Sequence, residues 1–516
     1  MIIHESGSPH PAGRFSFQAM QTITESASES RKVSYPLTRL ETRCRILPAD
    51  TVTPVSLYLK LRDRYPGTLL LECTDYHSRE NSYSLIGLEP IASFKVQSGL
   101  LEVRLPDGEV KEAAGWDRTL AEQLQTFTES LQATVDPNLE SKTASVASSF
   151  SGFFGHTAFE AVEHFDNHQL NPEKQTGEVP ALHYRFFRFI IAVDHFHDRL
   201  YLIENAPLGG DDSESRMDDV VTAIRRPVQP DFPFRLSGPE SSTMTDEDYL
   251  ALVEKARAHC QRGDVFQLVL SRRFSTAFRG DEFSVYRELR SVNPSPYLFF
   301  FDFGEYKVFG SSPEAQLVIR DQTARIDPIA GTVPRTGRDE EDSQEARRLA
   351  ADPKENAEHV MLVDLARNDL GRHGNDVEVV AFREVRYFSH VIHLVSEVEA
   401  QLPEGTNPYT VFGDTFPAGT LSGAPKHKAV ELIDRYEPHA RGFYGGAIGF
   451  FSLSGSVNHA IAIRTFLSKD SALHYQAGAG LVIASDAQSE LEEVNNKLGA
   501  LRRAMQAAHD QNTSQS

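Results

Sequence analysis

Cysteine is scarce in this sequence. The 516 residues include only Cys44, Cys73 and Cys260, an odd number that lacks the spacing of metal ligands. We therefore expect neither a disulfide framework nor a zinc site.

Positive charge is also in short supply. The sequence has 52 Lys and Arg against 73 Asp and Glu, which gives a net charge of −21. Nucleic-acid binders need Lys and Arg to neutralise phosphates, so this class is disfavoured. A small anionic substrate stays open, because a few buried cations or a metal ion can reverse the local charge.

Long apolar runs and nucleotide-binding loops are absent as well. The sequence contains neither a signal peptide nor a membrane span, so we expect a cytoplasmic protein. It has no GxGxxG or Walker-type loop that would support a nucleotide cofactor. The 40% hydrophobic and 24% charged residues are typical of a globular protein, with two to four domains or one unusually large one.

Changes in polarity divide the chain into three parts. Residues 1–40 are polar and predict a mobile leader. Residues 207–246 are rich in Pro, Ser and Asp, which favours a domain seam. We therefore expect an N-terminal domain over residues 41–235 and a second domain over residues 236–510.

Strand patterns dominate these two domains. They recur within residues 57–103 and 181–202, and a hairpin is predicted to turn at Gly455. Residues 136–149 and 166–178 are low in aliphatic side chains and are predicted to be loops. Because the strands do not alternate regularly with helices, we predict an α+β fold of large, mostly antiparallel sheets packed together with flanking helices.

A predicted helix beginning at Asp352-Pro353 carries a carboxylate on its apolar side. This residue is Glu358, and burial there requires a partner. The partner is either a basic residue such as Arg367 or a cation.

A second predicted helix begins at a capping box formed by Ser489 and Glu492. Glu493 and Lys497 follow at the border of its apolar stripe. They either form an intrahelical ion pair on a solvated face, or Glu493 meets Glu358 across a cleft and shares Mg²⁺ with it.

Two glycine-rich segments are candidate anion sites. GTLSGAPK at 419–426 combines glycines, which allow close approach to a ligand, with the hydroxyls of Thr and Ser. QAGAG at 476–480 ends a strand before the second helix, so its backbone amides can hold a carboxylate, or it is simply a tight bend.

Three further side chains interrupt or follow apolar strand patterns. Arg464, if it faces inward from its strand, needs an anion such as a carboxylate. His393 is either a core residue or a catalyst, and His390 fits the pattern equally well. Glu314 follows a strand, where loops often present reactive groups, or it caps the next element.

Six ordered motifs together resemble the large, synthase subunits of anthranilate synthase, in the family of chorismate-utilising enzymes. The resemblance is dense over residues 245–505 and looser over residues 55–95. The motifs are SPE at 312–314, PIAGT at 328–332, EHVMLVDLARNDL at 358–370, HLVS at 393–396, GTLSGAPK at 419–426 and QAGAG at 476–480.

The resemblance implies a Mg²⁺-dependent lyase at the first committed step of tryptophan synthesis. Ammonia adds to ring position two of chorismate and the 4-hydroxyl leaves. The aminodeoxyisochorismate formed then loses pyruvate and becomes anthranilate.

The resemblance also implies roles for individual residues. It places metal ligands at Glu358 and Glu493 and acid–base residues at Glu314 and His393, with Thr332 also catalytic. It places substrate contacts at Thr420, Tyr444, Arg464, Gly478, Gly480 and Lys497.

Two positions separate this chain from related enzymes. Aminodeoxychorismate synthases carry a lysine nucleophile where this chain has Ala330, and isochorismate synthases carry a lysine base where it has Gln267. Ammonia is therefore the expected nucleophile. An enzyme that stops at aminodeoxyisochorismate and an inactive regulatory protein that binds tryptophan or chorismate are the alternatives.

The resemblance further implies a partner and an inhibitor. A separate glutaminase subunit would supply ammonia within a heterotetramer. L-Tryptophan would bind a regulatory pocket formed by Glu72, Cys73, Tyr83, Pro296, Tyr297 and Leu298. Cys73 and Leu298 replace Ser and Met of the family, so the affinity for tryptophan is expected to differ; alternatively, Pro296 and Tyr297 are ordinary turn and core residues.

Overall fold

The computed structural model describes residues 35–73, 82–114, 120–174, 179–209, 213–227, 232–388 and 391–513. Pro36–Ser516 forms one compact unit. Most of the predicted leader, residues 1–34, lies outside the described residues. The predicted division near residue 235 stays a prediction.

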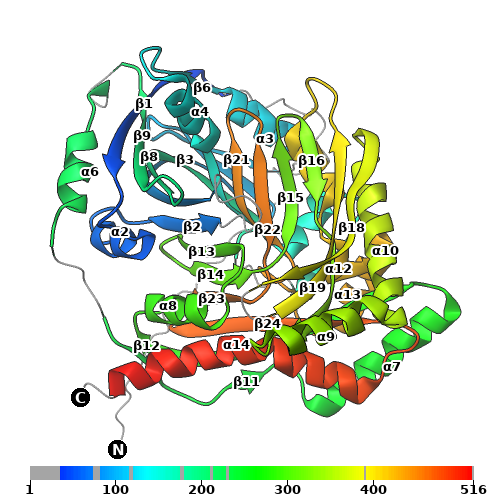
Figure 1. Ribbon diagram of the computed structural model, residues 1–516. Helices are drawn as coiled ribbons and strands as arrows, with labels where there is room; N and C mark the ends of the chain where they lie inside the picture. Colours follow the sequence, from blue (N-terminus) through cyan, green and yellow to red (C-terminus); the bar gives the residue numbers. More distant parts are fainter. Residues whose placement is uncertain are drawn as a thin grey trace, which may run out of the picture. The chain divides into compact units, whose positions relative to one another are not determined.

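The strands form two runs of paired strands that share β3 and β8 (Figure 1). The first run is β6 (Leu131–Val135), β1 (Thr38–Pro48), β9 (Arg199–Pro207), β8 (Leu182–Asp194), β3 (Tyr83–Gln97), β2 (Leu69–Cys73), β13 (Tyr297–Asp302), β14 (Lys307–Ser312), β23 (Thr465–Lys469), β24 (Ala472–Leu481) and β12 (Gln267–Gly280). β12 also pairs with β10 (Phe234–Leu236), β11 (Ser241–Ser242) and β20 (Gly423–Ala424).

The second run starts from the other halves of β3 and β8. On one side β3 pairs with β4 (Leu100–Arg104), which pairs with β5 (Val110–Ala114). On the other side β8 leads to β7 (Gly152–Thr157), β21 (Ala447–Ser452), β22 (Val457–Ile461), β15 (Ala315–Arg320), β16 (Thr323–Ile326), β19 (Val391–Gln401) and β18 (Asn375–Tyr387), and β17 (Ile329–Pro334) also pairs with β19. Among the described pairs only β1 and β6 run parallel.

A buried apolar cluster joins the two runs. It includes Leu71 and Phe299 from the first run and Phe154 and Ile448 from the second. The shared strand β8 is buried almost throughout because it is covered on both faces. The predicted α+β architecture with mostly antiparallel sheets is confirmed.

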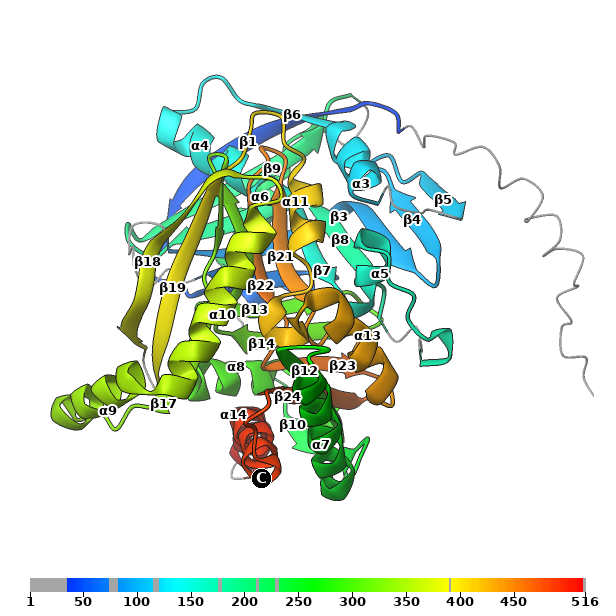
Figure 2. The same ribbon diagram turned by 90° about the vertical axis from the view of Figure 1, so that its right-hand side faces the viewer.

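Helices cover the outer faces and edges of these strands. They are α2 (Pro54–Leu61), α3 (Leu120–Glu129), α4 (Ser141–Phe150), α5 (Val162–Phe165), α6 (Met217–Ile224), α7 (Asp246–Arg262), α8 (Phe283–Val292), α9 (Asp339–Ala351), α10 (Pro353–Leu370), α11 (Pro408–Thr415), α12 (Gly419–Ser422), α13 (Lys426–Tyr436) and α14 (Ala487–Thr513), with the short 3₁₀ turns η2 (Phe159–Ala161) and η3 (Pro172–Lys174). α14 packs against α8 and β24 (Figure 1). α10 packs against β17 and β19 (Figure 2). None of the described helices is both long and apolar enough to cross a membrane.

Local sequence signals account for several of these elements. Thr245 caps α7 by accepting a hydrogen bond from the Asp248 backbone N–H, and Asp248 reciprocates. α10 begins at Pro353, as predicted. The predicted hairpin is confirmed, since β21 and β22 are antiparallel and Gly455 lies between them with φ at +88°.

Two local predictions are wrong. Residues 141–150, mostly within a predicted loop, form α4, because Thr143, Val146 and Ala147 share one helical face and bury it. Ser489 does not cap α14. The helix begins at Ala487, and Asp486 accepts a hydrogen bond from the Ser489 N–H at 2.9 Å.

Candidate active site

The carboxylate of Glu358 meets Gln267 and the glycine-rich end of β24. Gln267 Nε2 donates a hydrogen bond to Glu358 Oε1 at 2.8 Å. A Cβ atom at Gly480 would lie 2.5 Å from Gln267 Nε2 and 3.4 Å from Glu358 Oε1. Only glycine leaves room for this contact. α10, β12 and β24 therefore converge at one point.

The second predicted carboxylate, Glu493, flanks the same strand. Lys497 Nζ lies 2.7 Å from Glu493 Oε1 and donates a hydrogen bond to the Gly478 carbonyl at 2.9 Å. The intrahelical ion pair is thus present, and it is half-exposed rather than buried. Glu358 therefore lies next to Gly480, and Glu493 is linked to Gly478 through Lys497.

The carboxylates of α10 and α14 come in pairs one helical turn apart. Glu355 precedes Glu358, and its Oε2 atom lies 3.1 Å from the Cβ position of Gly331. Glu490 precedes Glu493 and is buried. Among the described residues no cluster of three or more His, Cys, Asp or Glu is arranged around a metal position. The chemistry of this oxygen-rich set still fits Mg²⁺, which retains several waters.

Sequence reasoning assigned no role to Glu355 or Glu490. The three-residue spacing from Glu358 and Glu493 was the signal that could have identified them, since residues three apart share a helical face.

Glu314 is a buried carboxyl group held next to Thr420. Thr420 Oγ1 donates a hydrogen bond to Glu314 Oε1 at 3.0 Å. Burial raises the pKa of Glu314 to about 8, although Thr420, Lys497 and Arg464 act in the opposite direction. Glu314 is therefore protonated at neutral pH and can serve as an acid.

Arg464 lies in a bend between β22 and β23 rather than inside a strand. Its φ of +50° is in the left-handed region, which is uncommon for a residue with a side chain. Nη1 donates a long hydrogen bond, 3.4 Å, to Asn293 Oδ1. Burial lowers the pKa of the Arg464 guanidinium, and the neighbouring Glu314 carboxyl group acts in the opposite direction when it ionises. The strand prediction was wrong, because the apolar pattern continues through the bend.

The two ring nitrogens of His393 differ in their hydrogen bonding. Nδ1 lies 2.9 Å from the Gly331 carbonyl and 3.1 Å from Thr332 Oγ1. The buried Nε2 has no hydrogen-bond partner among the described residues. Burial lowers the pKa of His393 to about 4, so the ring is neutral. With Nδ1–H donating to the carbonyl, Nε2 keeps a lone pair and can accept a proton. His390 lies outside the described residues.

Tyr444 is buried and is held in place by Arg441, which sequence reasoning missed. Burial raises the pKa of Tyr444, and a hydrogen bond with the Gly478 backbone partly offsets this. Arg441 Nη1 donates to the Leu421 carbonyl at 2.7 Å and Nη2 to the Val269 carbonyl at 2.9 Å. Its guanidinium lies 5.6 Å from the Tyr444 ring centre. Arg441 thus ties together the backbone around Thr420, strand β12 and Tyr444.

A buried ion pair supports this arginine. Glu437 Oε1 lies 2.6 Å from Arg441 Nη2 and also accepts hydrogen bonds from the Ser271 backbone and side chain. No short motif marks this network, because Arg441 and Glu437 contact partners far away in the sequence.

The predicted regulatory residues lie on three adjacent strands but on two faces of them. In the register, Cys73 pairs with both Tyr83 and Tyr297, and these two tyrosines pack against the main apolar cluster. The side chain of Cys73 lies outside the described part. Leu298 pairs with Glu72, one position along, and so faces the other way. Pro296 directly precedes β13.

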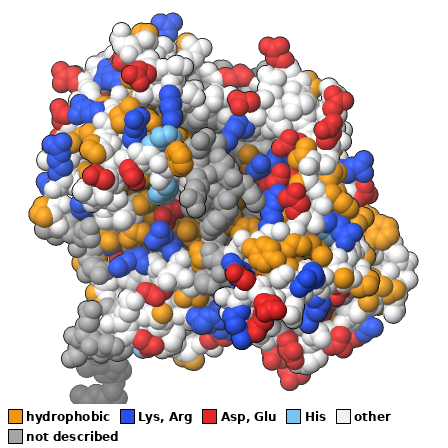
Figure 3. All heavy atoms as spheres, viewed as in Figure 1, with side chains coloured by type: hydrophobic (Ala, Val, Ile, Leu, Met, Phe, Trp, Pro, Cys, Tyr) orange, Lys and Arg blue, Asp and Glu red, His pale blue; other side chains and the backbone are white. Residues whose placement is uncertain are grey.

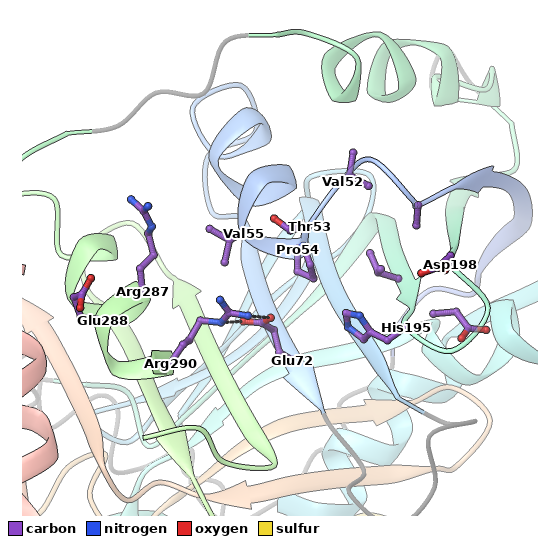
Figure 4. Close-up of a pocket in the computed structure, with 13 residues that line it drawn as sticks. Val52, Thr53, Pro54, Val55, Glu72, His195, Asp198, Arg287, Glu288 and Arg290 are labelled. Atoms are coloured by element: carbon purple, nitrogen blue, oxygen red, sulfur yellow. Dashed lines mark hydrogen bonds and ion pairs between the residues drawn. The ribbon is translucent and has the colours of Figure 1, made fainter. Parts of the chain in front are cut away.

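Glu72 faces a cavity of about 540 Å³ on its own side of β2 (Figure 4). Its carboxylate accepts a hydrogen bond from Tyr286 at 2.6 Å and pairs with Arg290 at 2.7 Å. Arg287 and Glu288 of α8 and His195 also line this cavity.

Acidic and basic side chains are interspersed over the face shown in Figure 3.

Comparison with models of protein families identifies the family of the chain. The family model of the chorismate binding enzymes matches residues 71–503. The chain belongs to this family.

Within this family, the chain is similar to curated anthranilate synthase subunits and to their solved structures. The chain is 36% identical to anthranilate synthase component 1 of Neisseria meningitidis serogroup C over 90% of this chain and 94% of the relative. It is 37% identical to anthranilate synthase component 1 of Geobacillus stearothermophilus, over 89% of this chain and 92% of the relative. The crystal structure of anthranilate synthase component I from Streptococcus pneumoniae matches with a TM-score of 0.69 and 31% identity, covering 89% of this chain and 99% of that one. The chain also shares its fold with the isochorismate synthase MenF of Escherichia coli. The TM-score is 0.66 and the identity 20%, covering 95% of this chain and 99% of that one.

Proposed function

We propose that this protein converts chorismate and ammonia to anthranilate and pyruvate, the first committed step of tryptophan synthesis. The observation that carries the proposal is Gln267. It stands where the resembling isochorismate synthases carry a lysine base, and it is hydrogen-bonded to Glu358. A neutral amide cannot deprotonate water, whereas ammonia needs no such base. Ala330 likewise excludes a lysine nucleophile at the other diagnostic position.

Glu314 is the proposed acid for departure of the 4-hydroxyl. Hydroxide is a poor leaving group, so a protonated donor at this oxygen lowers the barrier. The raised pKa of Glu314 supports this role. Thr420 orients the carboxyl group through its hydrogen bond.

His393 is the proposed base for removal of the ring proton when pyruvate leaves. The Gly331 carbonyl and Thr332 fix its ring through Nδ1 and leave Nε2 to take the proton. Its buried, neutral state supports this role.

Chorismate is a dianion, and the site supplies compensating charge. Arg464 and Lys497 are cations that act on the buried Glu314 and so lie near the reaction site. Arg464 is the proposed carboxylate ligand, with Thr420, Tyr444, Gly478 and Gly480 as further substrate contacts.

Glu358 and Glu493 are the proposed Mg²⁺ ligands. When bound, Mg²⁺ would neutralise a substrate carboxylate and position it. Glu355 and Glu490, one turn away on each helix, would bind its waters.

A glutaminase subunit is the proposed source of ammonia. The relatives are named component 1, which implies a second component. We expect a heterotetramer in the cytoplasm, with L-tryptophan as a feedback inhibitor at Tyr83, Tyr297 and their neighbours on the same face of the strands.

The test is anthranilate fluorescence of the purified protein with chorismate, Mg²⁺ and ammonium. A signal that EDTA removes and tryptophan suppresses supports enzyme, metal and inhibitor together. Consumption of chorismate without pyruvate release would instead identify an aminodeoxyisochorismate synthase. A protein that binds chorismate or tryptophan without turnover would be the inactive regulatory alternative.

A further inference from the structure

A small cavity borders Glu314 and extends along α10. Glu314 and Gln316 line one side, Leu362, Ala366 and Asp369 of α10 another. It offers about 30 Å³ to water-sized molecules. One water needs roughly 10–15 Å³ by this measure, so about two waters fit.

One wall of the cavity presents a buried acceptor. Gln316 is 3% exposed, and its Nε2 donates a hydrogen bond to Thr415 Oγ1 at 3.1 Å. Its Oε1 atom accepts no hydrogen bond from a described protein group. Leaving such an acceptor unsatisfied is unfavourable, so it favours water in the adjoining cavity.

The far end of the cavity leads to a charged pair. Lys426 Nζ donates to Asp369 Oδ2 at 2.9 Å and to the Thr415 carbonyl at 2.8 Å. The Asp369 side chain, which lines the cavity, is 7% exposed and that of Lys426 15%, so the pair keeps a little contact with solvent. Leu362, Leu365 and Ala366 make the α10 wall apolar, and Thr415 and Thr420 also line the cavity. The two waters that fit would form a short file.

We infer that water in this cavity returns protons to Glu314 from the Asp369–Lys426 end. This inference rests on the proposed function, in which Glu314 gives its proton to the departing hydroxyl. The Glu314 O–H bond and the substrate C–O bond break, and water leaves. A cavity water then donates a proton to the Glu314 carboxylate and is reprotonated along the file from bulk solvent. The cycle leaves no net charge on the protein.

Gln316→Leu tests the inference by removing the acceptor that holds the water. We expect kcat to fall about tenfold, less than the roughly 10²–10⁴-fold expected for loss of the acid itself, because Glu314 is kept. KM for chorismate stays within about twofold, because Gln316 is hydrogen-bonded to Thr415, which is not a proposed substrate contact. The solvent deuterium isotope effect on kcat rises, and small acids such as formic acid, added to the assay, restore part of the rate.

Gln401→Leu is the matched control. Gln401 Nε2 makes the same kind of bond, to Thr323 Oγ1 at 2.9 Å, at an exposed position. Ala366→Leu, which fills the cavity from α10, is a second variant and should reproduce the kinetic effects of Gln316→Leu. Wild-type kcat and isotope effect in both folded cavity variants would overturn the inference.

A high-resolution crystal structure of the wild-type protein gives a test that does not depend on activity. Ordered water between Gln316 Oε1 and Glu314 supports the inference, and a dry cavity overturns it. No turnover of chorismate by the wild type would refute the proposed function and the proton return with it, while the hydration of the cavity would still be decided by the crystal structure.

Discussion

Replacing Glu314 by Gln tests whether the fold keeps this carboxyl group protonated. Burial raises its pKa from 4.5 to about 8. At about 1.4 kcal/mol per pKa unit, this corresponds to about 5 kcal/mol in the free energy of ionisation. Between these two pH values the folded state holds a proton here that the unfolded state has lost. The free energy of unfolding of the wild type therefore falls as the pH rises through this window.

Gln cannot ionise, so position 314 of the variant causes no loss of unfolding free energy as the pH rises. Relative to the wild type, Glu314→Gln should gain up to about 5 kcal/mol in unfolding free energy between pH 4.5 and pH 9, with no further gain above that. Urea unfolding at pH 5, 7 and 9 measures the difference. Anthranilate formation should fall about 10²–10⁴-fold, because the acid is gone.

Glu340→Gln, an exposed residue of α9, controls for the loss of one surface charge. If wild type and Glu314→Gln showed parallel pH dependence, Glu314 would be ionised in the folded protein. The reasoning that makes it the acid would then fail.

Three other changes probe the metal, the buried ion pair and the buried histidines. Glu358→Gln should abolish Mg²⁺-dependent turnover and preserve the melting temperature, so full activity at low Mg²⁺ would contradict the metal assignment. Glu437→Gln leaves Arg441 buried without its counter-ion and should cost about 3–5 kcal/mol in urea unfolding; a loss below about 1 kcal/mol would disprove the role of the pair. Burial lowers the pKa of His156 and of His459 from 6.5 to about 3. The unfolded state binds more protons below pH 6.5, so stability should fall as the pH drops from 6.5 towards 3, and His459→Gln should flatten this fall in a denaturation series.

An acidic protein can bind an anionic substrate because the charge near the site differs from the net charge of the whole protein. The net charge is −21, yet acidic and basic side chains are interspersed on the face shown in Figure 3. The buried Arg464 and the half-exposed Lys497 both act on the same buried carboxyl group. Few cations are enough beside such a group, since charges interact more strongly away from water.

Features that depend on neighbouring residues were predictable from the sequence. The capping box at Thr245, the start of α10 at Pro353 and the turn at Gly455 follow from local hydrogen bonds and backbone preferences. The motifs likewise indicated the family, since each motif is a short contiguous segment. The helix at 141–150 escaped prediction because packing, not composition, stabilises it.

Features that depend on long-range contact were decided by the tertiary structure alone. Gln267 meets Glu358 across 91 positions, and Thr420 meets Glu314 across 106. The state of Glu314 follows from desolvation, which only the surrounding fold can impose. Strand register separated Glu72 from Tyr297, because a shift of one position reverses the face of a side chain. The sequence therefore determined which chemical groups are available, and the packing decided which of them meet and in which protonation state.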